Sequence, residues 1–296
     1  MSTCDETFVR SGRLRLWTER FGDPAAPAVL LIMGTSTQGI AWPDDLLDAL
    51  ADSGRQVIRF DNRDTGRSDC VDFTAEPYAL ADLAADATAV LDGHGIAAAH
   101  IVGISLGATI GQWLAVHRAS RVLTLTAMSA SPMGNQPGPA WARAFAGQPA
   151  LDGELPPPTA SFVRHVLSSA GAPGADTDVQ TWRVLNGDVL PFDEPAARTF
   201  VARSHARAGN LAAALNHDLA GRRFDDDRRA PLSTITAPAL VVHGSADPLF
   251  PPAHGEALAA QIPGARLEVL PGMGHHPFFA PGLTGRIADL IIHHTA

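Results

Sequence analysis

Short runs of apolar and β-branched residues alternate with helix-like segments along most of this chain. Such alternation is typical of a mostly parallel, twisted β-sheet that is covered by helices on both faces. Strands are predicted over 7–10, 14–21, 28–33, 56–60, 99–103, 123–128, 239–243 and 266–270. The first two are expected to form an antiparallel pair across Gly12. The sequence therefore predicts an α/β fold.

The alternation stops between Met128 and Pro238, where no segment has a convincing strand pattern. Proline and glycine clusters interrupt this region, and residues 161–169 and 194–219 have helical patterns. We interpret residues 132–231 as an inserted, mainly helical cap. Residues 1–131 and 232–296 are then expected to form the α/β core.

The composition excludes several classes of chemistry. The chain contains no lysine, which excludes a lysine Schiff base, attachment of pyridoxal phosphate, a Ser-Lys dyad and a Walker lysine. A formal net charge of −9 disfavours nucleic acid and anionic membranes as partners, so a small molecule is expected instead. No histidine pair has metal-ligand spacing with a carboxylate, and we expect neither a metal nor a cofactor.

Two cysteines are too few for a disulfide framework or a cysteine-based zinc site. The chain has no signal-peptide pattern at its start, and no apolar window long enough to span a membrane. We therefore expect a cytoplasmic protein, with a monomer as the default assembly.

Ser105 lies at the centre of a G-x-S-x-G sequence, Gly103-Ile104-Ser105-Leu106-Gly107. A predicted strand precedes this sequence and a helix-like segment follows it, so Ser105 is expected on a tight strand-to-helix turn. Glycines suit such a turn because the backbone is strained and neighbouring chains approach closely. A glycine-rich turn without catalytic function is the alternative, but the context favours a nucleophilic serine.

A serine hydroxyl needs a base and a group that orients the base. Asp247 follows one predicted strand, and His275 follows the next. Serine, then acid, then histidine is the chain order of an α/β-hydrolase triad. Two alternatives stay open, namely that Asp247 only forms a turn and that the adjacent His276 is the base.

Acyl transfer also requires hydrogen-bond donors for the oxyanion. We expect one donor to be the backbone N–H of Leu106, directly after the nucleophile. The second is expected in the loop after the strand at 28–33, and Thr35 is our candidate for it.

With these residues in place, the chain resembles the α/β-hydrolase fold family over nearly its whole length. The segment from Asp61 to Ser68 is similar to the D-x-R-x-x-G-x-S segment of many members, where it has a structural role. Further segments resemble the aclacinomycin methylesterase group: Met33-Gly34, Ala41-Trp42-Pro43-Asp44, Arg63-Asp64-Thr65-Gly66-Arg67-Ser68 and Pro271-Gly272-Met273-Gly274-His275. This resemblance implies Ser105, Asp247 and His275 as the triad, with Thr35 and Leu106 as the oxyanion donors.

Members of that group hydrolyse the carbomethoxy ester of anthracycline polyketides, so the resemblance implies a serine carboxylic ester hydrolase, a methylesterase of polyketide antibiotic biosynthesis. Lactone hydrolysis, carbon–carbon bond hydrolysis and perhydrolysis on the same triad remain open, as does a non-catalytic ligand-binding relative. A small apolar ester, such as a polycyclic aromatic polyketide, would need an apolar pocket. Candidate lining residues are aromatic or apolar: Met133, Trp141, Phe145, Phe162, Trp182, Phe192, Phe200, Phe278 and Phe279.

Overall fold

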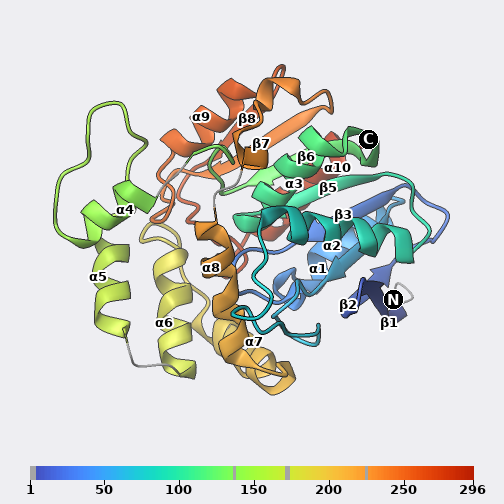
Figure 1. The fold of residues 1–296 in the computed structure, drawn as a ribbon, viewed down its shortest axis with the longest axis horizontal. Coiled ribbons are helices and arrows are strands. Elements are labelled where there is room, and N and C mark those ends of the chain that lie inside the picture. The colour runs from blue at the N-terminus through green and yellow to red at the C-terminus, as the bar shows by residue number, and fades with distance from the viewer. Residues whose placement is uncertain (1–4, 136–137, 171–173, 224–225) are drawn as a thin grey trace.

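The computed structural model describes residues 5–135, 138–170, 174–223 and 226–296. Within these residues, eight strands form one twisted sheet in the order β1-β2-β4-β3-β5-β6-β7-β8 (Figure 1). The strands are β1 (Asp5–Ser11), β2 (Leu14–Phe21), β3 (Ala28–Ile32), β4 (Gln56–Phe60), β5 (Ala99–Ile104), β6 (Val122–Met128), β7 (Ala239–Gly244) and β8 (Arg266–Leu270). Every predicted strand is confirmed.

The pairing directions place the ends of the strands. β1 pairs antiparallel with β2, and β2 pairs antiparallel with β4. The remaining neighbours, from β4 and β3 through β5 and β6 to β7 and β8, pair in parallel. The carboxyl ends of β3, β5, β7 and β8 therefore meet along one edge, which is where α/β folds bind their ligands.

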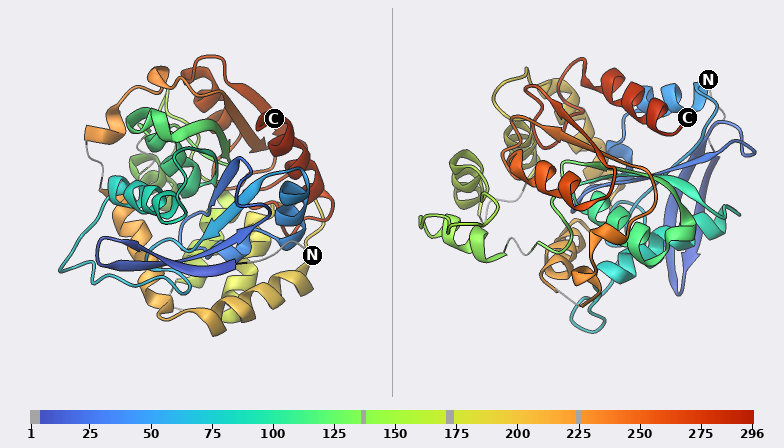
Figure 2. Two further views of the ribbon diagram at one scale, coloured as in Figure 1. Left: turned by 90° about the vertical axis from the view of Figure 1, so that its right-hand side faces the viewer. Right: turned by 90° about the horizontal axis from the view of Figure 1, so that it is seen from above.

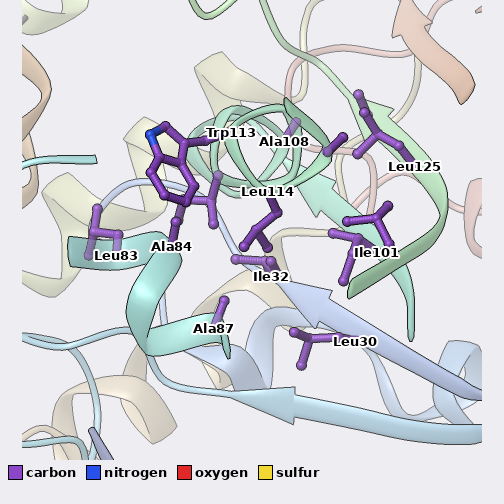
Figure 3. Close-up of a cluster of buried hydrophobic side chains, with 14 of the residues drawn as sticks. Leu30, Ile32, Leu83, Ala84, Ala87, Ile101, Ala108, Trp113, Leu114 and Leu125 are labelled. Atoms are coloured by element: carbon purple, nitrogen blue, oxygen red, sulfur yellow. The ribbon is translucent and has the colours of Figure 1, made fainter. Parts of the chain in front are cut away.

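Helices cover both faces of this sheet (Figure 2). Side chains alternate between the faces along a strand, so Leu30 and Ile32 of β3 face one core while Val29 and Leu31 face the other. The first core includes residues of α2 (Leu80–Gly93), α3 (Leu106–His117) and α9 (Ala253–Gln261), and Figure 3 shows α2 and α3 packed on β3 and β5. The second includes residues of α1 (Asp44–Asp52) and α10 (Leu283–His294).

The segment between β6 and β7 contains helices and connecting loops, and no strand among its described residues. It contains α4 (Gly138–Phe145), α5 (Ala160–Ser169), α6 (Ala175–Leu185), α7 (Glu194–Arg207) and α8 (Asn216–Arg222). These helices lie beside the sheet rather than within its layers (Figure 1). Short 3-10 helices occur at Gly39–Ala41 (η1), Ala119–Arg121 (η2), Leu211–Leu215 (η3), Asp226–Arg229 (η4) and Leu232–Thr234 (η5).

The helical pattern predicted over 194–219 is present but interrupted. α7 ends at Arg207, and the backbone at Ala208 is extended. The side chain of Asn210 then accepts a hydrogen bond from the N–H of Ala212 and starts η3. Asparagine competes with helix continuation in this way because its side chain can bond nearby backbone groups. Beyond this break the helical pattern resumes in η3 and α8.

Hydrogen bonds from Arg207 to buried polar side chains hold α7 on the core. Arg207 donates to Asp61 Oδ2 at 2.8 Å and to Gln38 Oε1 at 2.7 Å, and its guanidinium lies 4.0 Å from the ring centroid of Trp17. The carboxylate of Asp61 also accepts bonds from the backbone N–H groups of Gly39 and Arg67. The segment after β4 therefore serves as the anchor for α7.

None of the helices in the described ranges is long and apolar enough to cross a membrane.

Candidate active site

Ser105 lies on the turn between β5 and α3, at the carboxyl edge of the sheet. Its backbone has φ 55° and ψ −117°, a conformation that costs on the order of 1–3 kcal/mol for a residue with a Cβ. The flanking glycines have no room for a side chain: a Cβ on Gly103 would lie 2.2 Å from the carbonyl oxygen of Gly107. A Cβ on Gly107 would lie 2.0 Å from the carbonyl oxygen of Ile32. The strained elbow predicted from the motif is thus present, and it leaves Ser105 half-buried rather than enclosed.

The loop after β3 lies directly against this elbow. A Cβ on Gly34 would be 3.2 Å from the Cβ of Ser105, which places the peptide that enters Thr35 next to the serine. Leu106 is the first residue of α3, and the first N–H groups of a helix have no partner within it. The N-terminus of a helix also favours negative charge. Thr35 and Leu106 therefore both lie on segments next to Ser105. These are the segments in which we expected the oxyanion donors.

Asp247 and His275 are brought together by the loops after β7 and β8. These loops pack on each other, because the N–H of Ala246 donates to the carbonyl oxygen of Met273 at 3.0 Å. The ring Nδ1 of His275 then lies 2.9 Å from Oδ2 of Asp247. A proton on Nδ1 leaves Nε2 as the acceptor, which is the tautomer that a general base requires.

The carboxylate of Asp247 is held in its charged form. Burial alone would raise its pKa, but the charge of His275 and the hydrogen bond from its ring lower the pKa below the ordinary value. The backbone N–H groups of Leu249 and Phe250 donate to the other carboxylate oxygen at 2.9 and 2.8 Å. These bonds form the turn and fix the orientation of the carboxylate. The contact of Oδ2 with His275 goes beyond the role of a turn former.

His276 occupies a different environment. Its ring contacts Trp182, Phe278 and Phe279, with centroid distances of 4.5, 5.3 and 5.3 Å. Neither ring nitrogen has a hydrogen-bond partner among the described residues, and burial lowers the pKa to about 3. A base needs an orienting group, and of these two histidines only His275 contacts Asp247 in the described structure. The geometry favours His275.

Two further residues, His243 and Phe250, border the pair, and no motif pointed to either of them. The Nε2 atom of His243, on β7, lies 2.7 Å from the carbonyl oxygen of Phe250 and 3.6 Å from Oδ2 of Asp247. Burial lowers the pKa of His243, so it stays neutral beside the carboxylate. The ring of Phe250 lies 5.6 Å from the ring of His275. His243 and Phe250 thus shield Asp247 and His275 from water.

The aromatic residues expected to line a pocket fall into separate groups. Trp182, Phe192, Phe200 and Phe279 form one cluster around His276 through ring contacts. Phe278 packs on Trp42, with centroids 5.3 Å apart. Met133 is buried in the core beside α3, while Phe145 on α4 and Phe162 on α5 are half-buried.

Trp141 lines a cavity of about 540 Å³ whose wall also includes Pro156, His254 and Leu232. The ring of Phe250 contacts both this cavity wall and the candidate base. Its centroid lies 6.0 Å from that of Trp141 and 5.6 Å from that of His275. The lining does not include Ser105 or His275. The cavity is therefore next to the candidate site rather than part of it.

Comparisons with known proteins agree with this geometry. A sequence model of the alpha/beta hydrolase fold matches residues 27–280. The chain belongs to the α/β hydrolase fold family. It is 38% identical over 272 residues to the rhodomycin D methylesterase DauP of Streptomyces sp. (strain C5), covering 90% of this chain and 91% of that protein. Identity to the rhodomycin D methylesterase DnrP of Streptomyces peucetius is 39% over 274 residues, with the same coverage.

The structural comparison gives the same family. A solved hydrolase from Pseudomonas aeruginosa PA01 matches with a TM-score of 0.74 and 26% identity, over 98% of both chains. The order in which serine, acid and histidine follow one another here is also that of α/β hydrolases. Among the described residues, no group of three or more histidine, cysteine, aspartate or glutamate side chains is placed to hold a metal ion.

Proposed function

We propose that this α/β hydrolase is a serine carboxylic ester hydrolase that removes the methyl group from an ester of an anthracycline-like polyketide. The observation that carries the proposal is the hydrogen-bonded pair of His275 and Asp247 at the sheet edge that also holds Ser105 on its elbow. A buried carboxylate, an oriented imidazole and a strained, accessible serine are the parts that acyl transfer requires.

In the proposed reaction, the Oγ atom of Ser105 attacks the ester carbonyl carbon while Nε2 of His275 accepts the hydroxyl proton. The backbone N–H groups of Thr35 and Leu106 stabilise the negative oxygen of the tetrahedral intermediate. When the intermediate collapses, His275 returns the proton to the departing methoxide and methanol leaves. A water molecule then gives up a proton to His275 and attacks the acyl-enzyme. When this second intermediate collapses, His275 returns the proton to Oγ of Ser105 and the free acid leaves.

Two findings support a polyketide methyl ester as the substrate. The relatives DauP and DnrP are named as rhodomycin D methylesterases, and each match covers 90% of this chain, so the similarity extends into the segment between β6 and β7. We propose that residues 132–231 form a cap. This segment supplies aromatic side chains that contact the loop and residues after His275. An apolar, aromatic surface suits a polycyclic acyl group.

The test is a substrate panel. The protein is incubated with methyl esters of polycyclic aromatic polyketides, simple acyl esters, lactones and carbon–carbon hydrolase substrates, and the products are measured by mass spectrometry. Release of free acid and methanol from the polyketide esters, absent in Ser105→Ala, is expected. Cleavage of small esters alone would refute the polyketide substrate, and turnover of lactones or carbon–carbon bonds alone would refute methylesterase activity.

A further inference from the structure

His217 links the helical segment to the loop that carries Thr35. It lies on α8, is 1% exposed, and its ring sits between two core loops. The backbone N–H of Ser36 donates to Nδ1 of His217 at 3.0 Å. On the other side of the ring, Nε2 lies 2.8 Å from the carbonyl oxygen of Arg63.

These two contacts define the tautomer of His217. Nδ1 accepts a hydrogen bond, so it carries no proton, and Nε2 donates its proton to the carbonyl of Arg63. Burial lowers the pKa of His217, which keeps the ring neutral and Nδ1 an acceptor. A protonated ring could not accept from Ser36, so the neutral form is required for this link.

The turn held by His217 is unusual in its backbone. Ser36 has φ 57°, in the left-handed region that residues other than glycine seldom occupy. The N–H of Thr37 closes the turn on the carbonyl oxygen of Gly34 at 3.3 Å. Thr35 and Ser36 are thus the two central residues of this turn. Ser36, which has the left-handed backbone, donates its N–H to His217.

We propose that His217 is a positioning residue, which fixes the turn of residues 34–37 so that the N–H of Thr35 points at the oxyanion. The inference rests on the proposed function, because it concerns the oxyanion donors of that reaction. It assigns to α8 a role in catalysis, because a side chain from this helix holds part of the catalytic loop in place. Loss of one oxyanion donor slows turnover by about 10²–10³, so a loosened turn should lower kcat by a part of that factor.

Two substitutions of His217 separate its two hydrogen bonds. In His217→Gln the amide can take the place of Nε2 and still donate to Arg63, but the acceptor for Ser36 is lost. In His217→Asn the side-chain oxygen can take the place of Nδ1 and still accept from Ser36. We expect kcat to fall by about 10- to 100-fold in His217→Gln and by no more than about threefold in His217→Asn, with KM nearly unchanged in both.

Asn216 provides a matched control for simple docking of α8. Its side-chain amide donates to Asp64 Oδ2 and to the carbonyl oxygen of Val71, both at 3.1 Å, and does not contact the turn. Asn216→Ala should lower the Tm while leaving kcat within about threefold of the wild type. A loss of kcat in Asn216→Ala equal to that in His217→Gln would overturn the proposal, because docking alone would then explain both.

Ser36→Gly keeps the test decisive if His217→Gln does not fold. Glycine accepts the left-handed backbone, and the change removes only the hydroxyl bond to the carbonyl oxygen of Ala214, which is 2.7 Å long. The N–H link to His217 remains, so the loss of kcat should be smaller than the loss of about 10- to 100-fold expected for His217→Gln. A large loss of kcat in Ser36→Gly would mean that the hydroxyl holds the turn, and the proposal would be wrong.

A trifluoromethyl ketone probes the oxyanion contacts without turnover. Ser105 Oγ adds to the ketone carbon, the hydroxyl proton moves to His275, and the former carbonyl oxygen becomes the bound oxyanion. The inhibition constant should rise in His217→Gln by a factor similar to the loss of kcat, and stay near wild type in His217→Asn. Wild-type protein that neither hydrolyses esters nor binds the ketone would refute the proposed function; active wild type with unchanged His217→Gln would refute only the role of His217.

Discussion

Replacement of Arg207 by methionine leaves the carboxylate of Asp61 buried without its counter-charge. Asp61 is 0% exposed, and Arg207 donates to it at 2.8 Å from α7. Methionine has a flexible apolar side chain, but the guanidinium that lies over the Trp17 ring and donates to Asp61 and Gln38 is lost together with its charge. Removal of one partner from a buried ion pair costs about 3–5 kcal/mol. At about 2 °C per kcal/mol for a chain of this size, the Tm should fall by about 6–10 °C.

The pH dependence tests the cause. Burial raises the pKa of Asp61 above its ordinary value, although Arg207 and two backbone N–H groups lower it. A carboxyl group with a raised pKa favours the fold while protonated, and this contribution is lost as the pH rises past its unfolded value. Without Arg207 the pKa rises further. The Tm difference between Arg207→Met and wild type should therefore be widest near about pH 7 and narrow as the solution is acidified.

Thermal unfolding followed by calorimetry measures both effects. Arg198→Met is the matched control on the same helix, because Arg198 is half-exposed and pairs with Asp176 and Glu194 at 2.7 and 2.8 Å. Exposed ion pairs contribute little, so this control should leave the Tm nearly unchanged. Equal Tm losses in the two variants, or a loss in Arg207→Met that does not change with pH, would refute the reasoning.

Other variants test the site. Asp247→Asn should lower kcat by about 10³–10⁴-fold with little change in Tm, because the His275 tautomer is no longer fixed; a loss below about tenfold would contradict the role of Asp247. Gly107→Ala should prevent folding, because the new Cβ would lie 2.0 Å from the carbonyl oxygen of Ile32. Gly285→Ala is the control, because the space around Gly285 is open, and it should raise the free energy of unfolding in urea by about 0.5–1 kcal/mol. His276→Phe should remain active and resist acid better. The pKa of His276 falls from 6.5 to about 3 on burial, so the wild type loses stability as the pH drops below 6.5, by about 2 kcal/mol at about pH 5. Loss of ester hydrolysis in His276→Phe would favour His276 as the base.

The sequence predicted what depends on local pattern. Strand positions followed from short apolar runs, and the elbow at Ser105 followed from glycines whose Cβ atoms would collide with backbone. Ser105, Asp247 and His275 each follow a predicted strand, and the carboxyl ends of parallel strands meet at one edge of the sheet.

Contacts between distant segments could not be read in the same way. Ser36 and His217 are 181 residues apart, and Arg207 and Asp61 are 146 apart, with no motif that pairs them. Such contacts depend on how the segment between β6 and β7 docks on the core, which local periodicity does not encode. The break within the helical pattern of 194–219 was also not predicted, and there the side chain of Asn210 accepts a hydrogen bond from the N–H of Ala212.

The most direct test of the central claim is covalent labelling of the nucleophile. The protein is treated with a fluorophosphonate at neutral pH, digested, and the modified peptide is identified by mass spectrometry. The account predicts one label per chain on Ser105, little label in Ser105→Ala, and much slower labelling in His275→Ala. Labelling that is unchanged in Ser105→Ala, or that proceeds at the wild-type rate without His275, would contradict the assignment of the triad.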